Sequence, residues 1–349
     1  MNVRNEIEHI YDELVSIRRD FHMHPELSCN EFETAKKIAN FLEKNEIAYT
    51  AGVATTGVVG IIHGTKPTTN PTKTIALRAD IDALPIEEIN DVAYRSQVNH
   101  VMHACGHDVH TTILLGVAKI LQKNCHEFSG SIKLFFHPAE ETVGGALPMI
   151  EAGCLDNPKV DYVLGLHVMP YLQTGMVELK YGKLNAASDY IKIVIRGKSG
   201  HGAYPEQSTD AIVIAGHLLV ALQTLVSRNT SPLNSVVLSF GTIVGGVKGN
   251  VIADEVVLTG TLRTLDSTTR QFTKDRIIEI ATNQAKSFCG HATVEISPGY
   301  EPLINDDETV SVLSDISRHL LGSENVVFKD APSLGVEDFS YFSNRVKGA

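Results

Sequence analysis

Hydrophobic and polar residues are arranged in two distinct patterns along the first half of the chain. Three segments have apolar residues at helical spacing: residues 1–20, 35–45 and 111–124. Four short apolar runs are typical of buried strands: residues 56–64, 73–84, 131–138 and 161–168. Because strands and helices follow one another here, we predict an α/β fold with a mixed, mainly parallel sheet and helices on both faces.

The segment between the first two predicted helices is polar and breaks the helical spacing. Ser28 and Glu31 stand three residues apart in it. This spacing is typical of a capping box, in which two side chains bond to backbone amides at the start of a helix. We therefore predict that Ser28 and Glu31 begin the second helix.

The pattern changes near residue 183. The next segments are predicted as strand, helix, strand, strand and helix, in this order: residues 187–205, 210–228, 235–246, 255–265 and 269–290. Closed by a final strand, this order is typical of an α+β, ferredoxin-like domain. We predict that residues 184–295 form such a domain, inserted into a first domain that comprises residues 1–183 and 296–349.

Charge and cysteine content limit the classes of function and location. The chain has 349 residues and a formal net charge of −11, which disfavours nucleic acid and anionic membranes as partners. Its five cysteines are widely spaced, which indicates a reducing cytoplasm rather than a disulfide framework. The N-terminus is polar and no apolar run approaches the ~20 residues of a membrane span. We therefore predict neither a signal peptide nor a transmembrane helix.

Residues 102–110 contain an unusual density of side chains that can bind metal. Cys105 and His107 alternate there, with two further histidines beside them, just before a predicted helix. A strand or loop end before a helix is where open α/β sheets place ligands, and imidazole and thiolate suit zinc and similar metals. Asp108 could orient an imidazole from behind. The alternative is a polar loop that happens to be rich in histidine.

Three further predicted strands end in polar side chains. Glu140 and Glu141 follow one strand, His167 ends another, and Asp80 and Asp82 end a third. Adjacent carboxylates point in different directions, so one can bind a metal while the other takes a proton from a metal-activated water. Solvated turns and a core histidine are the alternatives for each segment alone. Together, these strand ends predict a metal centre.

The predicted inserted domain contains three candidates for substrate contact. His201 lies in a glycine-rich turn, where an imidazole could polarise a substrate carbonyl. Asn250 offers an amide, and Arg263 could clamp a carboxylate. The alternative for each is an ordinary surface or structural residue. The chain has no P-loop, no GxGxxG motif after a strand, no GxSxG motif and no HExxH motif.

These segments, in this order, resemble a known family. The resemblance rests on residues 18–31, 77–88, 102–112, 137–141, 165–170, 200–205 and 335–342. The chain is similar to the aminoacylase and hippurate hydrolase family of dinuclear metal-dependent amidohydrolases. The subgroup contains N-acyl-amino-acid amidohydrolases, auxin-conjugate hydrolases and N-acetyl-diaminopimelate deacetylases. The resemblance implies hydrolysis of a small N-acyl amino acid to a carboxylate and a free amino acid.

The resemblance also implies roles around two divalent metal ions, zinc or else manganese, nickel or cobalt. Cys105 would bridge the two ions. His107 and His167 would complete the protein ligands of one ion, and Glu141 would bind the other. Glu140 would act as general base towards the attacking water and would later protonate the leaving amine.

The remaining roles implied by the resemblance concern support and substrate. Asp80 would support the ligands, and Asn250 and Arg263 would hold the substrate. His201 would reach the active site of the partner in a homodimer and steady the oxyanion. The inserted domain would be the dimerisation lid.

The sequence departs from the family pattern at its end. It stops at Ala349, ahead of the segment that in the family contains a final histidine ligand of the second metal. The residues given leave that metal only Cys105 and Glu141. Two hypotheses follow: an active amidohydrolase, or a weak or inactive truncated homologue that acts as a dimeric binding protein.

Overall fold

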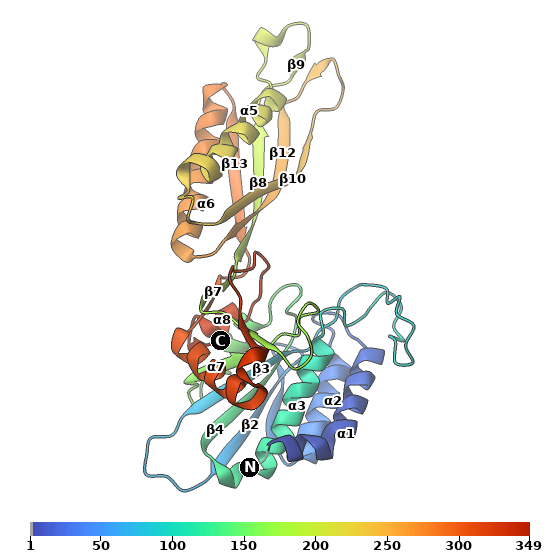
Figure 1. The fold of residues 1–349 in the computed structure, drawn as a ribbon. Coiled ribbons are helices and arrows are strands. Elements are labelled where there is room, and N and C mark those ends of the chain that lie inside the picture. Colours follow the sequence, from blue (N-terminus) through green and yellow to red (C-terminus); the bar gives the residue numbers. More distant parts are fainter. Residues whose placement is uncertain (1–2) are drawn as a thin grey trace. The chain divides into compact units, whose positions relative to one another are not determined.

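The computed structural model of the protein describes residues 3–349 (Figure 1). The contacts within the chain define two compact units. The first unit comprises Met1–Gly182, Asn305–Lys329 and Asp338–Ala349. The second unit comprises Lys183–Ile304 and Asp330–Glu337. The chain therefore interrupts the first unit to build the second.

The first unit is built on a six-stranded sheet with the order β1-β2-β4-β3-β5-β16. The strands are β1 (Ala48–Val53), β2 (Gly57–Thr65), β3 (Thr74–Asp80), β4 (Ser129–His137), β5 (Tyr162–Gly165) and β16 (Lys347–Gly348). The pairs β4–β3, β3–β5 and β5–β16 are parallel, and the other two are antiparallel. A parallel pair, β6 (Val177–Leu179) with β15 (Val326–Phe328), lies outside this sheet.

Helices cover both faces of this sheet. The helices of the unit are α1 (Val3–Met23), α2 (Phe32–Lys44), α3 (His107–Lys123), α4 (Ala146–Glu151), α7 (Asp307–Leu321) and α8 (Ser340–Ser343), with short 3-10 turns at Cys125–Glu127 and Ser323–Asn325. Figure 1 shows α1, α2 and α3 side by side, and α3 contacts both others. The prediction of a mixed, mainly parallel α/β fold is confirmed.

The alternation of side chains along β4 explains the two covered faces. Leu134 and Phe136 pack into the core that α2 and α3 cover. Phe135, between them, points to the opposite face because successive strand residues do so, and its ring lies 5.4 Å from that of Phe342 in α8. All three β4 side chains are fully buried, which is why this stretch has no polar position.

The second unit is a four-stranded antiparallel sheet with two helices. Its main elements are β8 (Ala187–Arg196), α5 (Ala211–Thr224, extended by a π turn at Leu225–Asn229), β10 (Val236–Gly245), β12 (Glu255–Thr264), α6 (Ser267–Ser287) and β13 (His291–Pro298). The strand order is β10-β12-β8-β13. This is the predicted strand–helix–strand–strand–helix–strand sequence. Smaller elements are β9 (Gly200–His201) paired with β11 (Val251–Ile252), β7 (Gly182–Asn185) with β14 (Leu303–Asn305), and a 3-10 turn at Pro205–Gln207.

Helix α5 is more apolar than the sequence analysis allowed. With its π extension it spans Ala211–Asn229, which by length and composition could cross a membrane. Of the residues in its most apolar stretch, 33% are buried inside the protein. The prediction that no segment approaches this length was therefore wrong. Ile214, Leu218 and Leu222 lie in the core of the second unit, as in a core helix of a globular protein. The opposite side of α5 remains apolar and exposed, at Ile212, Val213 and Val220.

The capping-box prediction was also wrong. Helix α2 begins after Glu31, and neither Glu31 nor Ser28 caps it. The amides of Glu33 and Thr34 instead donate to the carboxylate of Glu26. Ser28 donates to Asp82, and Glu31 turns away from the helix into the interior of the first unit.

Candidate functional site

Three neighbouring strands of the first unit end at the same edge of the sheet. Strand β3 ends at Asp80, paired in parallel with His137 at the end of β4, and β5 follows on the other side of β3. The segments after β4 and β5 contain the predicted site residues Glu140, Glu141 and His167, and α3 begins with His107. Because parallel strands place their carboxyl ends together, residues far apart in sequence meet here.

The metal-ligand candidates form one cluster around His107. Donor atoms of Cys105, His107 and His167 lie within 4.8 Å of one another, and so do those of His107, Glu140 and Glu141. The Sγ of Cys105 is 3.3 Å from the Nε2 of His167. The structure thus brings together all four predicted ligands and the predicted base.

Hydrogen bonds turn the ligand nitrogens inward. The Nδ1 of His167 donates to the carbonyl of Val168 at 2.8 Å, which leaves Nε2 to face Cys105. The Nδ1 of His107 pairs with Asp82 at 3.2 Å, so its Nε2 faces two carboxylates, 3.7 Å from the Oε1 of Glu141 and 3.6 Å from the Oδ2 of Asp80. Fixing one ring nitrogen in this way selects the tautomer and aims the other nitrogen at a metal.

The donors fit a divalent transition metal. The Nε2 of His107 and the Oε1 of Glu141 are buried without a hydrogen-bond partner among residues 3–349, which is costly unless another group binds them. Burial lowers the pKa of His167, which favours the neutral imidazole that binds a metal. Burial raises the pKa of the Cys105 thiol, which a bound metal would reverse. Sulfur, nitrogen and oxygen donors together suit zinc and its neighbours.

Asp82 links two of the candidate ligands. Besides its contact with His107, its Oδ2 accepts the backbone amide of Glu141 at 3.0 Å and the hydroxyl of Ser28 at 2.7 Å. Burial opposes ionisation, but these hydrogen bonds and the charge of His107 hold the pKa of Asp82 below its ordinary value. Asp82 is therefore an anion that fixes both an imidazole and a carboxylate.

Replacing Asp82 by asparagine should weaken divalent-metal binding by about 10- to 100-fold, as for other residues that orient metal ligands. Competition with a chromogenic chelator measures this affinity. Asp161→Asn is the matched control, because Asp161 also accepts a backbone amide, that of Thr74 at the far end of β3. Equal affinity in Asp82→Asn and Asp161→Asn would contradict the role of Asp82.

Asp80 lies against His107, with its Oδ2 3.6 Å from the Nε2 of that ring. It is fully buried and pairs with Arg78 at 2.7 Å and with the Nδ1 of His110 at 2.6 Å. Burial alone would raise its pKa, but the charges of Arg78, His107 and His110 hold the pKa well below its ordinary value. Its position suits the supporting role that the sequence predicted.

His110 is a site residue that the sequence analysis left without a role. Its Nδ1 donates to Asp80, and its Nε2 accepts the amide of Val168 at 2.9 Å. Both ring nitrogens are thus used, and the imidazole holds the backbone beside His167. The signal in the sequence was its spacing of three from His107, which places both rings on one face of α3.

Asp108 orients a different imidazole from the one we expected. Its carboxylate binds the Nδ1 of His22 at 2.7 Å and forms an ion pair with Arg18. The Nε2 of His22 binds Glu88 at 3.1 Å. The hydrogen bond to Asp108, opposed by burial and helped by Glu88, raises the pKa of His22 above 6.5. Since His22 lies in the last turn of α1 and Asp108 in the first turn of α3, this imidazolium connects the two helices.

The contribution of His22 to stability should depend on pH. A raised folded-state pKa means that the stabilisation is fully present below the unfolded value of about 6.5 and is lost as pH rises through the folded value. We expect His22→Gln to lower the free energy of unfolding more at pH 6 than at pH 9 in urea titrations. A penalty for His22→Gln that is the same at both pH values would contradict this account.

The candidates in the second unit fall into two places. His201 is exposed in β9, where it pairs with Val251, and the amide of the next residue, Gly202, donates to the carbonyl of Asn250. Arg263 lies near the far end of β12, paired with Ser188. Its Nη1 is buried without a hydrogen-bond partner among residues 3–349. The structure therefore brings His201 and Asn250 together and places Arg263 apart from them.

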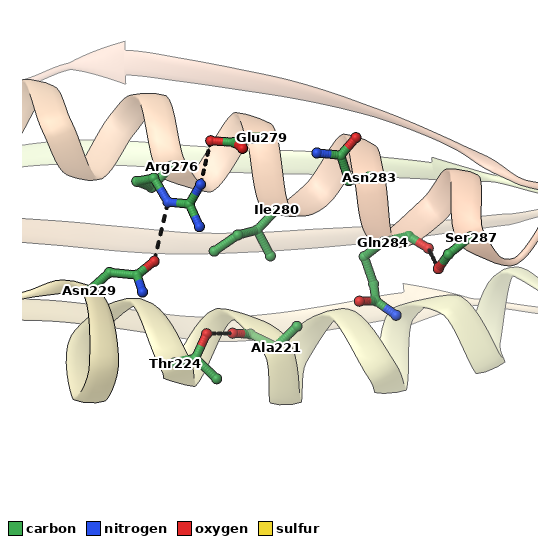
Figure 2. Close-up of a pocket in the computed structure, with 9 residues that line it drawn as sticks. All are labelled: Ala221, Thr224, Asn229, Arg276, Glu279, Ile280, Asn283, Gln284 and Ser287. Atoms are coloured by element: carbon green, nitrogen blue, oxygen red, sulfur yellow. Dashed lines mark hydrogen bonds and ion pairs between the residues drawn. The ribbon is translucent and has the colours of Figure 1, made fainter.

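The second unit also has a hollow of about 380 Å³ between α5 and α6 (Figure 2). Its only charged residues are Arg276 and Glu279, which pair with each other. Arg276 also donates to Asn229 at 3.2 Å. None of the candidate site residues lines this hollow, so it adds nothing to the site.

Comparisons with known proteins agree with this geometry. The model of the peptidase family M20/M25/M40 matches residues 76–349. The chain is 42% identical to N-acetyl-L-cysteine deacetylase of Bacillus subtilis, over 97% of this chain and 79% of that protein. It is 41% identical to thermostable carboxypeptidase 2 of Saccharolobus solfataricus, over 99% and 86%. The crystal structure of Bacillus subtilis YXEP, a dinuclear metal-binding peptidase, superimposes with a TM-score of 0.85 at 32% identity, over 98% and 88%.

Proposed function

Because the chain belongs to the peptidase family M20/M25/M40, we propose that it is a metal-dependent amidohydrolase of N-acyl amino acids. It cleaves the amide of an N-acetyl or N-benzoyl type substrate to a carboxylate and a free amino acid. The observation that supports this most directly is the cluster of Cys105, His107 and His167 beside Glu140 and Glu141. Two relatives support this substrate class by their names. One is a deacetylase of N-acetyl-L-cysteine, an N-acyl amino acid, and the other is a carboxypeptidase, which also cleaves an amide next to an amino acid.

The donors of the cluster support two divalent ions, as in the dinuclear YXEP structure. In this proposal Cys105 would serve both ions, His107 and His167 would bind one of them, and Glu141 would bind the other. Zinc suits these donors best, with manganese, nickel and cobalt as further candidates. When bound, such ions would polarise the acyl carbonyl and lower the pKa of water.

Glu140 is the proposed general base. Its side chain is 8% exposed and lies next to the proposed ligand Glu141, with a donor atom within 4.8 Å of His107. A carboxylate in this position can take a proton from the attacking water and return it to the leaving amine. The amine then departs neutral, which an amide nitrogen needs in order to leave.

The second unit is proposed as the lid and the dimerisation surface of a homodimer. Strand β10 is at the edge of its sheet, and Ile243 and Val244 on it are 54% and 67% exposed. Val220 on the outer side of α5 is 71% exposed. An apolar strand edge near an apolar helix face is a surface that a second copy can cover. Sedimentation of the protein and of Val220→Asp tests this, since the variant should shift towards monomer.

A mixing experiment tests the proposed role of His201 across the dimer. We expect His201→Ala and Glu140→Gln each to be inactive alone. In a random mixture half of the dimers are hybrids with one intact site, so about a quarter of wild-type activity should return. Lack of recovery would contradict action on the partner.

Asn250 and Arg263 are proposed to hold the substrate. The guanidinium of Arg263 would bind the carboxylate of the substrate.

The five cysteines are free thiols, which supports the proposed cytoplasmic location.

The function itself is tested by release of free amino acid from N-acetyl amino acids, N-benzoylglycine and dipeptides, with zinc, manganese, nickel or cobalt supplied. We expect metal-dependent release from at least one of these classes. No release from any member of the panel with any of the four metals would overturn the proposed function.

A further inference from the structure

The segment after β4 has a backbone conformation that needs support. Ala139 precedes Glu140 and has φ +57°, in the left-handed region that a residue with a β-carbon rarely occupies. It is 3% exposed, so solvent does not hold it in place. Such conformations persist only where surrounding contacts over-determine them, and they cluster at functional sites.

Glu31 supplies the contact that fixes this conformation. Its Oε1 accepts the backbone amide of Ala139 at 2.9 Å, and its Oε2 accepts the hydroxyl of Thr56 at 2.7 Å. Glu31 is fully buried and Thr56 is 1% exposed. One oxygen of the carboxylate is thus fixed by Thr56, and the other accepts the amide of the strained residue Ala139.

The other side of the strained peptide is equally enclosed. The amide of Gly144 donates to the carbonyl of Ala139 at 3.0 Å. A β-carbon at Gly145 would lie 2.0 Å from the carbonyl oxygen of Pro138, so the chain passes directly against this turn. The Ala139 amide itself donates to the carboxylate of Glu31.

We propose that Glu31 is a positioning residue that aims Glu140 at the substrate by holding Ala139 in its left-handed conformation. This rests on the proposed function, in which Glu140 is the general base. Asp82 and Glu31 therefore have different roles. Asp82 accepts the amide of Glu141 and orients the metal ligands, whereas Glu31 accepts the amide of the residue before Glu140. Loss of Glu31 should therefore affect proton transfer and leave metal binding intact.

The charge of Glu31 is not required for this role. Burial raises the pKa of Glu31, and a carboxyl or amide oxygen can accept the Ala139 amide equally well. Glutamine at position 31 keeps that oxygen, and the Thr56 hydroxyl can rotate to accept from the amide group. Alanine removes both contacts.

Kinetics of four variants on the best substrate of the wild-type panel test the proposal. Glu31→Ala should lower kcat by about 10- to 100-fold, as expected for a small misplacement of a reacting group, with KM and metal content unchanged. Glu31→Gln should stay within a few-fold of wild type. Glu26→Ala is the matched control, because Glu26 also accepts backbone amides beside α2 but does not contact Ala139.

The fourth variant is a rescue. Glycine adopts the left-handed conformation without the penalty of a β-carbon, so Ala139→Gly added to Glu31→Ala should recover part of the lost kcat. A wild-type kcat in Glu31→Ala, an equal loss in Glu26→Ala, loss of metal in Glu31→Ala, or no rescue would each overturn the role of Glu31. These results leave the proposed function standing, because wild type remains active. An inactive wild type overturns both.

Discussion

Replacing Glu140 by glutamine should lower kcat by about 10²- to 10⁴-fold, the range for loss of a general base, while the protein keeps its metal. Glutamine has the size of glutamate and can accept a hydrogen bond, but it cannot take a proton from water. Glu140 is buried beside the ligand cluster, so another solvent-borne base cannot easily replace it. Initial rates of amino-acid release, with elemental analysis of the same samples, measure both quantities.

Glu151→Gln is the matched control for this experiment. Glu151 ends α4 in the same unit and is exposed. It should leave both kcat and metal content unchanged. Turnover within ten-fold of wild type in Glu140→Gln would contradict the role of Glu140 as general base. Loss of metal in that variant would instead indicate that Glu140 is a metal ligand.

Replacing His107 by alanine should abolish both metal binding and turnover. His107 is common to both donor groups of the cluster, and its loss removes one of the two imidazoles proposed to bind the same ion. The effect on metal affinity should exceed the roughly 10- to 100-fold typical of residues that only orient ligands. Removal also leaves the buried Asp82 without its imidazole partner, which should cost about 1–3 kcal/mol of stability.

Metal titration by calorimetry and a thermal melt distinguish these two consequences. His126→Ala is the control, because His126 is exposed on a 3-10 turn of the same unit. It should retain wild-type metal affinity and melting temperature. Metal binding at wild-type affinity in His107→Ala would contradict the proposed centre, even if the variant had lost stability.

The fold class could be predicted because its signals are local. Continuous apolar runs gave β3, β4 and β5, and helical spacing gave α1, α2 and α3. The capping-box prediction failed because the same spacing of Ser28 and Glu31 also allows long-range contacts. Ser28 and Glu31 have capping-box spacing, but their side chains bind Asp82 and the Ala139 amide instead.

The candidate site could be predicted in part, because two of its ligands follow strands. Parallel strands bring their carboxyl ends together, which is enough to expect Glu141 and His167 in one place, whereas Cys105 lies in the loop just before α3. The residues that hold them were harder to find. Glu31 meets Ala139 across 108 positions and His22 meets Asp108 across 86, and no spacing within a sequence encodes such contacts.

The metal content per chain of the purified protein, after exposure to divalent metal, tests the central claim most directly. We predict about two ions per chain, as in a dinuclear relative, bound by Cys105, His107, Glu141 and His167. Elemental analysis of the protein after gel filtration gives this number. A content near zero would contradict the account, because the donors would then form no metal centre.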